Sequence, residues 1–165
     1  MKKISIRKAV EHDLDNLMRI FDTARQFMVR SGNPNQWING YPQRELIAGE
    51  IESGHCYVCE SETGQVVATF CFIPGPDPTY SYIENGDWPD NRPYYVIHRL
   101  ASDGTCKGIA KLCFDWCFSR YPCLRVDTHA ENKVLQHLLA ENGFRRCGII
   151  YLKNGSPRIA YQKER

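Results

Sequence analysis

With 165 residues, a 42% hydrophobic and 24% charged composition and a formal net charge of +2, the chain is typical of one globular domain over residues 1–165. The small charge and the lack of a lysine- and arginine-rich run argue against nucleic acid as a partner. No segment approaches the roughly 20 apolar residues of a membrane span, and residues 1–7 lack the apolar run of a secretion signal, so we expect a cytoplasmic protein without a membrane partner.

Hydrophobic periodicity predicts strands and helices along the whole chain. Apolar residues that recur every three or four positions mark buried helix faces, whereas segments rich in Val, Tyr, Phe and Thr mark strands. The expected elements, in chain order, are a strand at 5–8, a helix that starts at Glu11 and stops at Ser31, a helix that Pro42 opens and Gly54 ends, a hairpin of strands 55–60 and 65–73, a strand at 94–100, a helix that begins near Gly108, a strand at 123–127, a helix that ends at Asn142-Gly143, and strands at 144–151 and 158–161.

This order, β-α-α-β-β-β-α-β-α-β-β, predicts a mixed α/β fold. The early strands are expected to be antiparallel, and the β-α-β crossover in the middle requires parallel neighbours, whose carboxyl ends ligands favour. Residues 74–93 interrupt the pattern with five prolines and several aspartates. Long loops inside compact domains are usually functional, so we expect this loop to serve the site.

Cysteine is frequent in this chain. Without an export signal the thiols should be reduced. Cys56 and Cys59 form a C-x-x-C, but a zinc site would need a second pair of ligands at similar spacing. We therefore expect small buried hydrophobic residues and no metal, and a cysteine-based redox or metal protein remains as an alternative. The eight cysteines stand at positions 56, 59, 71, 106, 113, 117, 123 and 147.

The segment Tyr94–Lys111 carries the strongest functional signal. An expected strand leads into a short loop with Gly104 and Gly108, where a helix begins. Amides at a helix start and the helix dipole attract anions, and glycine lets a phosphate approach the backbone. Lys107 and Lys111 add positive charge. The spacing matches neither a P-loop nor a dinucleotide fingerprint, and an ordinary glycine-capped turn is the alternative.

This loop and the segments after it resemble the GNAT acetyltransferase superfamily. Thr105–Ala110 looks like the family's R/Q-x-x-G-x-G/A acyl-CoA signature. Asp127–Asn132, followed by Glu141–Phe144, is similar to its second signature, an asparagine that opens a helix ending in Gly-Phe. The resemblance covers nearly the whole chain. It implies the GNAT acyl-CoA N-acyltransferase fold and a transfer of acetyl from acetyl-CoA to a primary amine of a small molecule or protein by direct attack, with a non-catalytic acyl-CoA-binding module as the alternative.

The resemblance also implies how coenzyme A is bound. The loop backbone would hold the pyrophosphate, and the end of the preceding strand would pair with the pantetheine arm. Two residues depart from the family pattern: Thr105 stands where Arg or Gln is usual, and Leu139 stands where many members place a tyrosine that protonates the leaving thiolate. The expected cofactor-binding residues are Leu100, Ala101, Thr105, Cys106, Lys107, Gly108, Ile109, Ala110, Lys111 and Asn132.

Two histidines are candidate bases for removing a proton from the amine, because the pKa of histidine lies near neutrality. His98 precedes the loop, and His129 follows the next strand with Asp127 nearby. A structural role is the alternative for each. A backbone N–H near Leu100 is expected to stabilise the oxyanion.

The acceptor site is expected at the acidic and aromatic loop, whose carboxylates and rings suit a cationic amine. The alternative is a solvated loop with its rings packed on the sheet. Exposed sheet edges would also favour a homodimer. The expected substrate-binding residues are Trp37, Asp77, Tyr80, Glu84 and Trp88.

Overall fold

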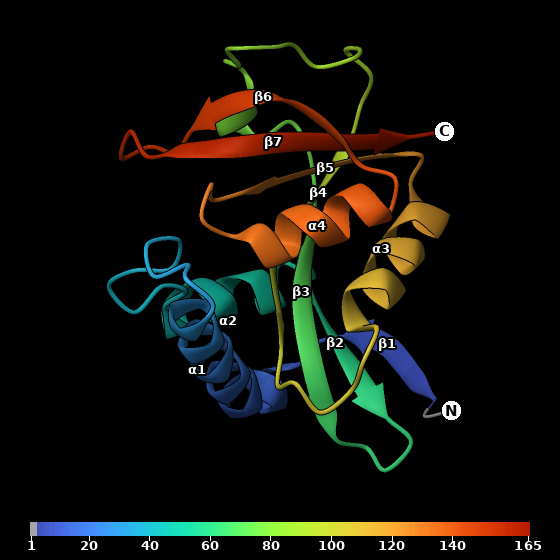
Figure 1. The fold of residues 1–165 in the computed structure, drawn as a ribbon. Helices are drawn as coiled ribbons and strands as arrows, with labels where there is room; N and C mark the ends of the chain where they lie inside the picture. The colour runs from blue at the N-terminus through green and yellow to red at the C-terminus, as the bar shows by residue number, and fades with distance from the viewer. Residues whose placement is uncertain (1–2) are drawn as a thin grey trace. The chain divides into compact units, whose positions relative to one another are not determined.

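A computed structural model describes residues 3–165 and confirms the mixed α/β fold (Figure 1). Met1 and Lys2, part of the segment considered as a secretion signal, lie outside the described residues. The seven strands follow the order β1-β2-β3-β4-β5-β7-β6. The strands are β1 (Ile4–Lys8), β2 (Cys56–Ser61), β3 (Val66–Pro74), β4 (Tyr95–Ser102), β5 (Cys123–Thr128), β6 (Arg145–Tyr151) and β7 (Pro157–Glu164), and the α-helices are α1 (Leu14–Arg30), α2 (Arg44–Glu52), α3 (Ile109–Arg120) and α4 (Lys133–Glu141).

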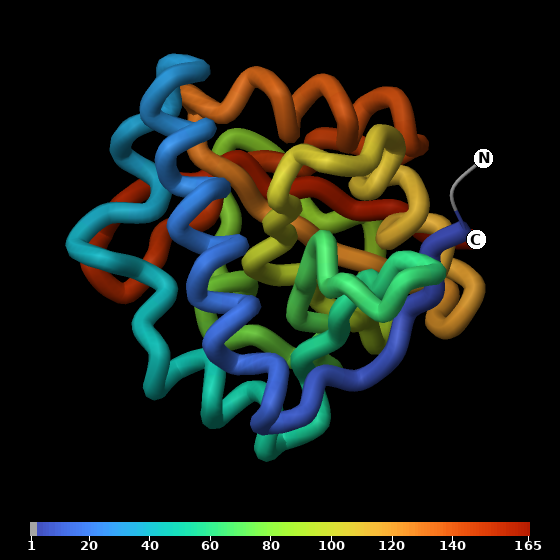
Figure 2. The backbone as a smooth tube through the Cα atoms, turned by 90° about the horizontal axis from the view of Figure 1, so that it is seen from below, coloured from blue at the N-terminus to red at the C-terminus, as the bar shows by residue number. Residues whose placement is uncertain are grey.

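The chain divides into two compact units, the first reaching Phe72 and including Arg99–Ile109, the second formed by Ile73–His98 and Ala110–Arg165. In the first unit β1, β2 and β3 are antiparallel, and the predicted hairpin is confirmed (Figure 2). Helix α1 buries Leu17 and Phe21 completely and contacts α2. The 3.6-residue spacing of these side chains explains why this face is buried.

Helix α2 begins later than the sequence predicts. Gln43 is extended, with ψ of 155°, and precedes the first helical residue, Arg44. The expectation that Pro42 opens the helix is therefore wrong. Proline suits the first helical position but does not impose it. Here Arg25 of α1 donates a hydrogen bond from Nη1 to the carbonyl oxygen of Tyr41 at 2.9 Å, which holds the chain before α2 in a loop.

In the second unit β7 pairs with β5 on one side and β6 on the other, both antiparallel. This double pairing explains why β7 extends to Glu164, beyond the expected end at Tyr161. Strands β4 and β5 pair in parallel through Tyr95↔Leu124 and Val96↔Arg125, which confirms the predicted crossover.

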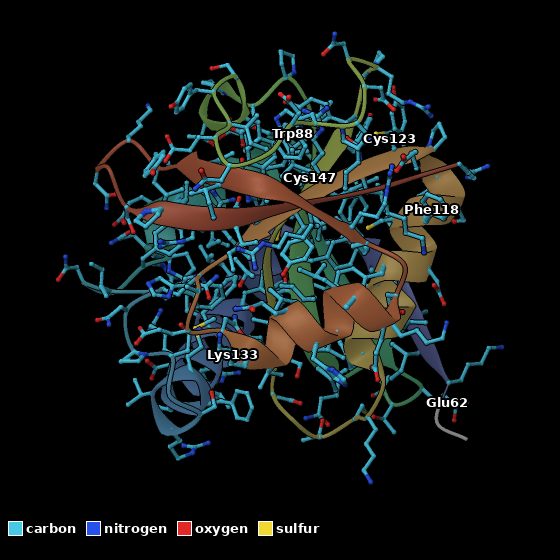
Figure 3. The ribbon with its side chains drawn as sticks, turned by 45° about the horizontal axis from the view of Figure 1, so that its top comes forward. Glu62, Trp88, Phe118, Cys123, Lys133 and Cys147 are labelled. Carbon is cyan, nitrogen blue, oxygen red and sulfur yellow. The ribbon has the colours of Figure 1, made fainter. Side chains whose placement is uncertain are left out.

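The long loop before β4 is docked onto β6. Glu84 and Ile149 exchange two backbone hydrogen bonds of 3.0 and 2.8 Å, so that the loop adds an antiparallel bridge to this strand. Trp88, labelled in Figure 3, packs against a buried cluster that includes Tyr80, Val96 and Ile150. The rings of Tyr80 and Trp88 therefore pack on the sheet, as the alternative interpretation of this segment proposed, whereas Tyr82 is exposed.

Replacing Gly148 of β6 should release this docking. A Cβ at Gly148 would lie 2.7 Å from the backbone oxygen of Glu84 and 2.9 Å from a side-chain carbon of Ile83, so the backbones must separate. We expect Gly148→Ala to lower the free energy of unfolding by about 1–3 kcal/mol and to speed hydrogen exchange at the Ile149 amide. Gly49→Ala is the matched control, because nothing lies within 4 Å of that position in α2. An unchanged exchange rate at Ile149 would contradict the docking argument.

All eight cysteines are free thiols, and for the seven that are buried the expected role as small core residues is confirmed. Cys106 alone is partly exposed. In residues 3–165 no group of three or more His, Cys, Asp or Glu side chains is placed to hold a metal ion. None of the helices in this range is both long and apolar enough to cross a membrane.

Candidate active site

Strand β4 changes its backbone conformation directly after His98. Arg99 has φ of 56°, in the left-handed region that residues other than glycine rarely adopt. The strand continues through Leu100 to Ser102, so the irregularity lies inside it. Irregular positions of this kind redirect side chains and interrupt ladder pairing, and they are frequent beside active sites.

The side chain of Arg99 holds this conformation in place. Its Nε donates to the hydroxyl of Tyr41 at 2.8 Å, and its Nη1 donates to the carboxylate of Glu50 at 2.8 Å. The guanidinium is 14% exposed and the Glu50 side chain 16% exposed, so the ion pair is largely shielded from water. Strained backbone persists only where surrounding contacts fix it, and these two contacts do so.

His98 lies beside an ionised carboxylate. Its Nε2 is 3.2 Å from Oδ2 of Asp77, while the backbone N–H and the hydroxyl of Thr79 donate to Oδ1 at 2.9 and 2.8 Å. Burial raises the pKa of Asp77, but the hydrogen bonds from His98 and Thr79 outweigh this and lower it to about 2. With Nε2–H donated to Asp77, the neutral ring carries its lone pair on Nδ1.

The low pKa of Asp77 predicts a pH-dependent contribution to stability. Because the folded pKa is below the unfolded value of about 3.9, the stabilisation is present above that pH and is lost as the pH falls towards 2. Asp77→Asn should therefore lower the free energy of unfolding at pH 7 by on the order of 2 kcal/mol and much less at acidic pH. Urea unfolding across this pH range measures the difference, with Asp22→Asn on the exposed face of α1 as the control. A loss independent of pH would show that the charge of Asp77 is not the cause.

Tyr80 links His98 to a second carboxylate. Its side chain is 2% exposed, its Oη donates to Oδ2 of Asp127 at 2.7 Å, and its ring centroid lies 6.5 Å from that of His98. Burial and the nearby Asp127 charge raise the pKa of Tyr80 well above its ordinary value, so the hydroxyl remains a donor. The sequence indicates Asp127 only as the first residue of the second signature and as a neighbour of His129. Asp127 lies near the end of β5, which is parallel to the strand that carries His98, and this position could have indicated that it belongs to the site.

The other expected acceptor residues are engaged by the protein. Trp88 donates from Nε1 to the carbonyl of Tyr80 at 2.9 Å, and the guanidinium of Arg125 lies 3.8 Å from the centre of its ring. Glu84 accepts hydrogen bonds from the hydroxyls of two tyrosines, Tyr82 and Tyr151. Trp37 belongs to the first unit, where it contacts Phe21 and Tyr41 edge to face. The structure thus brings Asp77, Tyr80 and His98 together in the second unit.

His129 and Asn132 shape the start of α4. Nδ1 of His129 accepts a hydrogen bond from the backbone N–H of Glu131 at 3.0 Å, and burial together with the charge of Arg158 lowers the pKa of His129. Oδ1 of Asn132 caps α4 by accepting from the N–H of Leu135 at 3.0 Å. Nδ1 of His129 is therefore already occupied by a hydrogen bond from the backbone.

Hydrogen bonds within the expected phosphate loop stabilise part of its conformation. Asp103 accepts from the N–H and the hydroxyl of Thr105 at 2.9 and 2.6 Å. In the described chain the amides of Cys106, Lys107 and Gly108, just before α3, have no hydrogen-bond partner. Added Cβ atoms at Gly104 and Gly108 would meet nothing within 4 Å. Donors beside open space at a helix start fit an anionic group such as a diphosphate.

Lys111, an expected cofactor-binding residue, and Leu139, at the position of the family's usual tyrosine, both lie in helices. Lys111 lies in the first turn of α3 and forms an exposed ion pair of 2.6 Å with Asp115. Leu139 of α4 is fully buried. An apolar, inaccessible side chain therefore occupies the position at which the family often carries a tyrosine hydroxyl.

Comparison with known proteins identifies the family. No protein-family model and no curated protein matches the chain. Among solved structures, a GNAT-family acetyltransferase from Streptococcus agalactiae is 31% identical, with a TM-score of 0.88 over 98% of this chain and 95% of that one. A GNAT-family acetyltransferase from Listeria monocytogenes, 20% identical, shares the fold over 100% of both chains with a TM-score of 0.72. Another, from Bacillus cereus, is 18% identical over 99% of this chain and 98% of its own, with a TM-score of 0.62. Because the identity to the streptococcal protein extends over nearly the full length of both chains, this chain belongs to the GNAT family of acetyltransferases.

Proposed function

We propose that the protein is a cytoplasmic N-acetyltransferase that transfers the acetyl group of acetyl-CoA to a primary amine of a small molecule or a protein. Family membership supports acetyl transfer. The single observation that carries the use of coenzyme A is the set of unpartnered amides at Cys106, Lys107 and Gly108. These donors lie at the positive end of the α3 dipole, where a diphosphate is stabilised.

In this proposal the end of β4 binds the pantetheine arm. Leu100 and Ala101 follow the left-handed residue Arg99, at which regular strand geometry is interrupted. Backbone groups released from a ladder can pair with an amide-containing ligand instead. Acetyl-CoA supplies a thioester, in which the acetyl carbon is already activated towards an amine.

His98 is proposed as the general base. Nδ1 accepts the proton that the amine loses, and Asp77 holds Nε2–H and stabilises the imidazolium. The amine nitrogen forms the C–N bond, the C–S bond breaks, and its electron pair leaves on sulfur. The backbone N–H of Leu100 is proposed to stabilise the oxyanion. His129, whose Nδ1 accepts a backbone N–H, is assigned to the turn before α4.

The thiolate is proposed to leave without a protein acid, because Leu139 has no proton to give. A thiol pKa of about 8.5 makes thiolate a tolerable leaving group. The same buried leucine favours the rival function, a non-catalytic acyl-CoA-binding module.

Two measurements on the purified protein separate these functions. Isothermal titration with coenzyme A should show binding, and a thiol-release assay with acetyl-CoA and a panel of primary amines should show amine-dependent turnover. Binding without turnover for every amine would favour the binding module. Absence of binding would refute both the acetyltransferase and the acyl-CoA-binding module.

A further inference from the structure

Asp127 of β5 is a partly buried carboxylate with no counter-charge. Its Oδ2 accepts a hydrogen bond from the neutral hydroxyl of Tyr80, and among residues 3–165 no lysine, arginine or histidine forms an ion pair with it. Two other shielded carboxylates are neutralised, Asp13 by Arg7 at 2.8 Å and Glu50 by Arg99 at 2.8 Å, whereas Glu84, like Asp127, is held by tyrosine hydroxyls. The negative charge of Asp127 is therefore available to a bound cation.

Tyr80 cannot supply the missing charge. Burial and the Asp127 carboxylate itself keep the hydroxyl protonated, so it donates one hydrogen bond and fixes one carboxylate oxygen. The second oxygen, Oδ1, is left for another donor. Because the pair of Tyr80 and Asp127 is built into the second unit, the carboxylate is oriented before any ligand arrives.

The sheet places Asp127 and His98 on the same face. Val96 of β4 is registered with Arg125 of β5 in parallel, and the residues two positions further along each strand are His98 and Asp127. Side chains two apart share a face. Both contact the same side chain, since the ring of Tyr80 lies beside His98 and its hydroxyl bonds Asp127.

We propose that Asp127 binds the acceptor as a cationic ammonium group and places its nitrogen beside His98, with Tyr80 as the positioning residue that orients the carboxylate. This inference rests on the proposed acetyl transfer and names its acceptor class: aliphatic primary amines, which are cations at neutral pH. One N–H of the ammonium remains on Asp127 while another proton passes to His98. The freed lone pair then forms the C–N bond, and the C–S bond of the thioester breaks with its electron pair leaving on sulfur. The nitrogen then loses its second proton to this thiolate, which gives the neutral amide and the free thiol of coenzyme A.

The test compares two classes of amine. Steady-state thiol release is measured with acetyl-CoA and butylamine or 1,4-diaminobutane as cationic acceptors, and with aniline as an acceptor that is neutral at pH 7.5. Asp127→Asn keeps an acceptor for the Tyr80 hydroxyl but removes the charge. It should lower the ratio of kcat/KM for the cationic amines to that for aniline by about 10- to 100-fold, mainly through KM of the amine.

Two further variants test whether the effect depends on the position of the charge and on the orientation that Tyr80 gives to the carboxylate. Asp87→Asn removes a charge from an exposed position of the acidic loop at residues 74–93 and should leave the ratio within twofold. Tyr80→Phe keeps the charge but frees the carboxylate, and should lower kcat more than it raises KM. Calorimetric titration of 1,4-diaminobutane in the presence of coenzyme A gives a readout independent of turnover, and Asp127→Asn should weaken this binding by a similar factor.

The outcomes separate this inference from the proposed function. If wild-type protein turns over amines and Asp127→Asn leaves the ratio unchanged, or lowers both classes equally, the role of Asp127 is refuted and acetyl transfer stands. If the wild type releases no thiol with any amine while it binds coenzyme A, acetyl transfer fails and this inference fails with it. Melting temperatures of the variants show whether an equal loss reflects unfolding.

Discussion

Replacing His98 with alanine is expected to lower kcat by about 10²- to 10⁴-fold at neutral pH, the usual contribution of a positioned base. The amine must lose a proton before it attacks, and Nδ1 of His98, held by Asp77 at Nε2, is the group proposed to take it. The deficit should shrink as the pH approaches the pKa of the amine, because more of the acceptor is then already neutral. The KM for acetyl-CoA should change less than twofold. A pH series of steady-state rates measures both effects.

His137→Ala provides the matched control. This histidine lies on α4, has a 73% exposed side chain and pairs with Glu141. It should leave kcat unchanged. A loss of less than fivefold in His98→Ala would refute its role as base, and His129→Ala would then be the next variant to measure.

Replacing Gly108 with alanine is expected to raise the Kd of coenzyme A by about 10- to 100-fold, equivalent to roughly 1.4–2.7 kcal/mol. Gly108 has φ of +75°, a conformation that costs an L-residue roughly 1–2 kcal/mol. Relief of that strain turns the amides of Cys106 and Lys107 away from their present positions, and the new methyl group occupies space proposed for phosphate. Calorimetric titration gives the Kd.

Gly155→Ala is the matched control, because it introduces the same backbone strain outside the proposed phosphate site. Gly155 lies in the turn between β6 and β7, has φ of +85° and, like Gly108, has nothing within 4 Å of an added Cβ. Both variants should lose similar stability. Equal affinities for coenzyme A in the two variants would refute the phosphate site at α3.

Much of the fold was predictable from the sequence because local signals agree with tertiary structure. The spacing of apolar residues around Leu17 and Phe21 predicts α1, and the turn residues Ser61–Gly64 predict the hairpin of β2 and β3. The glycine-containing segment before α3 predicts a phosphate loop, and the structure leaves amides there without partners.

The remaining features depend on contacts that no local pattern encodes. Arginine has no preference for left-handed backbone, so the irregularity at Arg99 could not be predicted without the contacts to Tyr41 and Glu50. Proline- and aspartate-rich composition suggests a solvated loop, whereas Tyr80 within it is buried because β4, β6 and β7 supply Val96, Ile150 and Ala160. The significance of Asp127 emerges only from its hydrogen bond to that buried tyrosine.

The close approach of Gly86 and Gly148 has a consequence for divergence among relatives. A Cβ at Gly86 would lie 1.9 Å from the carbonyl oxygen of Cys147, and one at Gly148 would lie 2.7 Å from that of Glu84. Neither position can acquire a side chain while the segment keeps its course. A descendant that accepts a bulkier residue at either position must reroute part of this loop. Asp77, which contacts His98, and Tyr80, which contacts Asp127, lie in the same loop, so a single codon change here could displace both contacts.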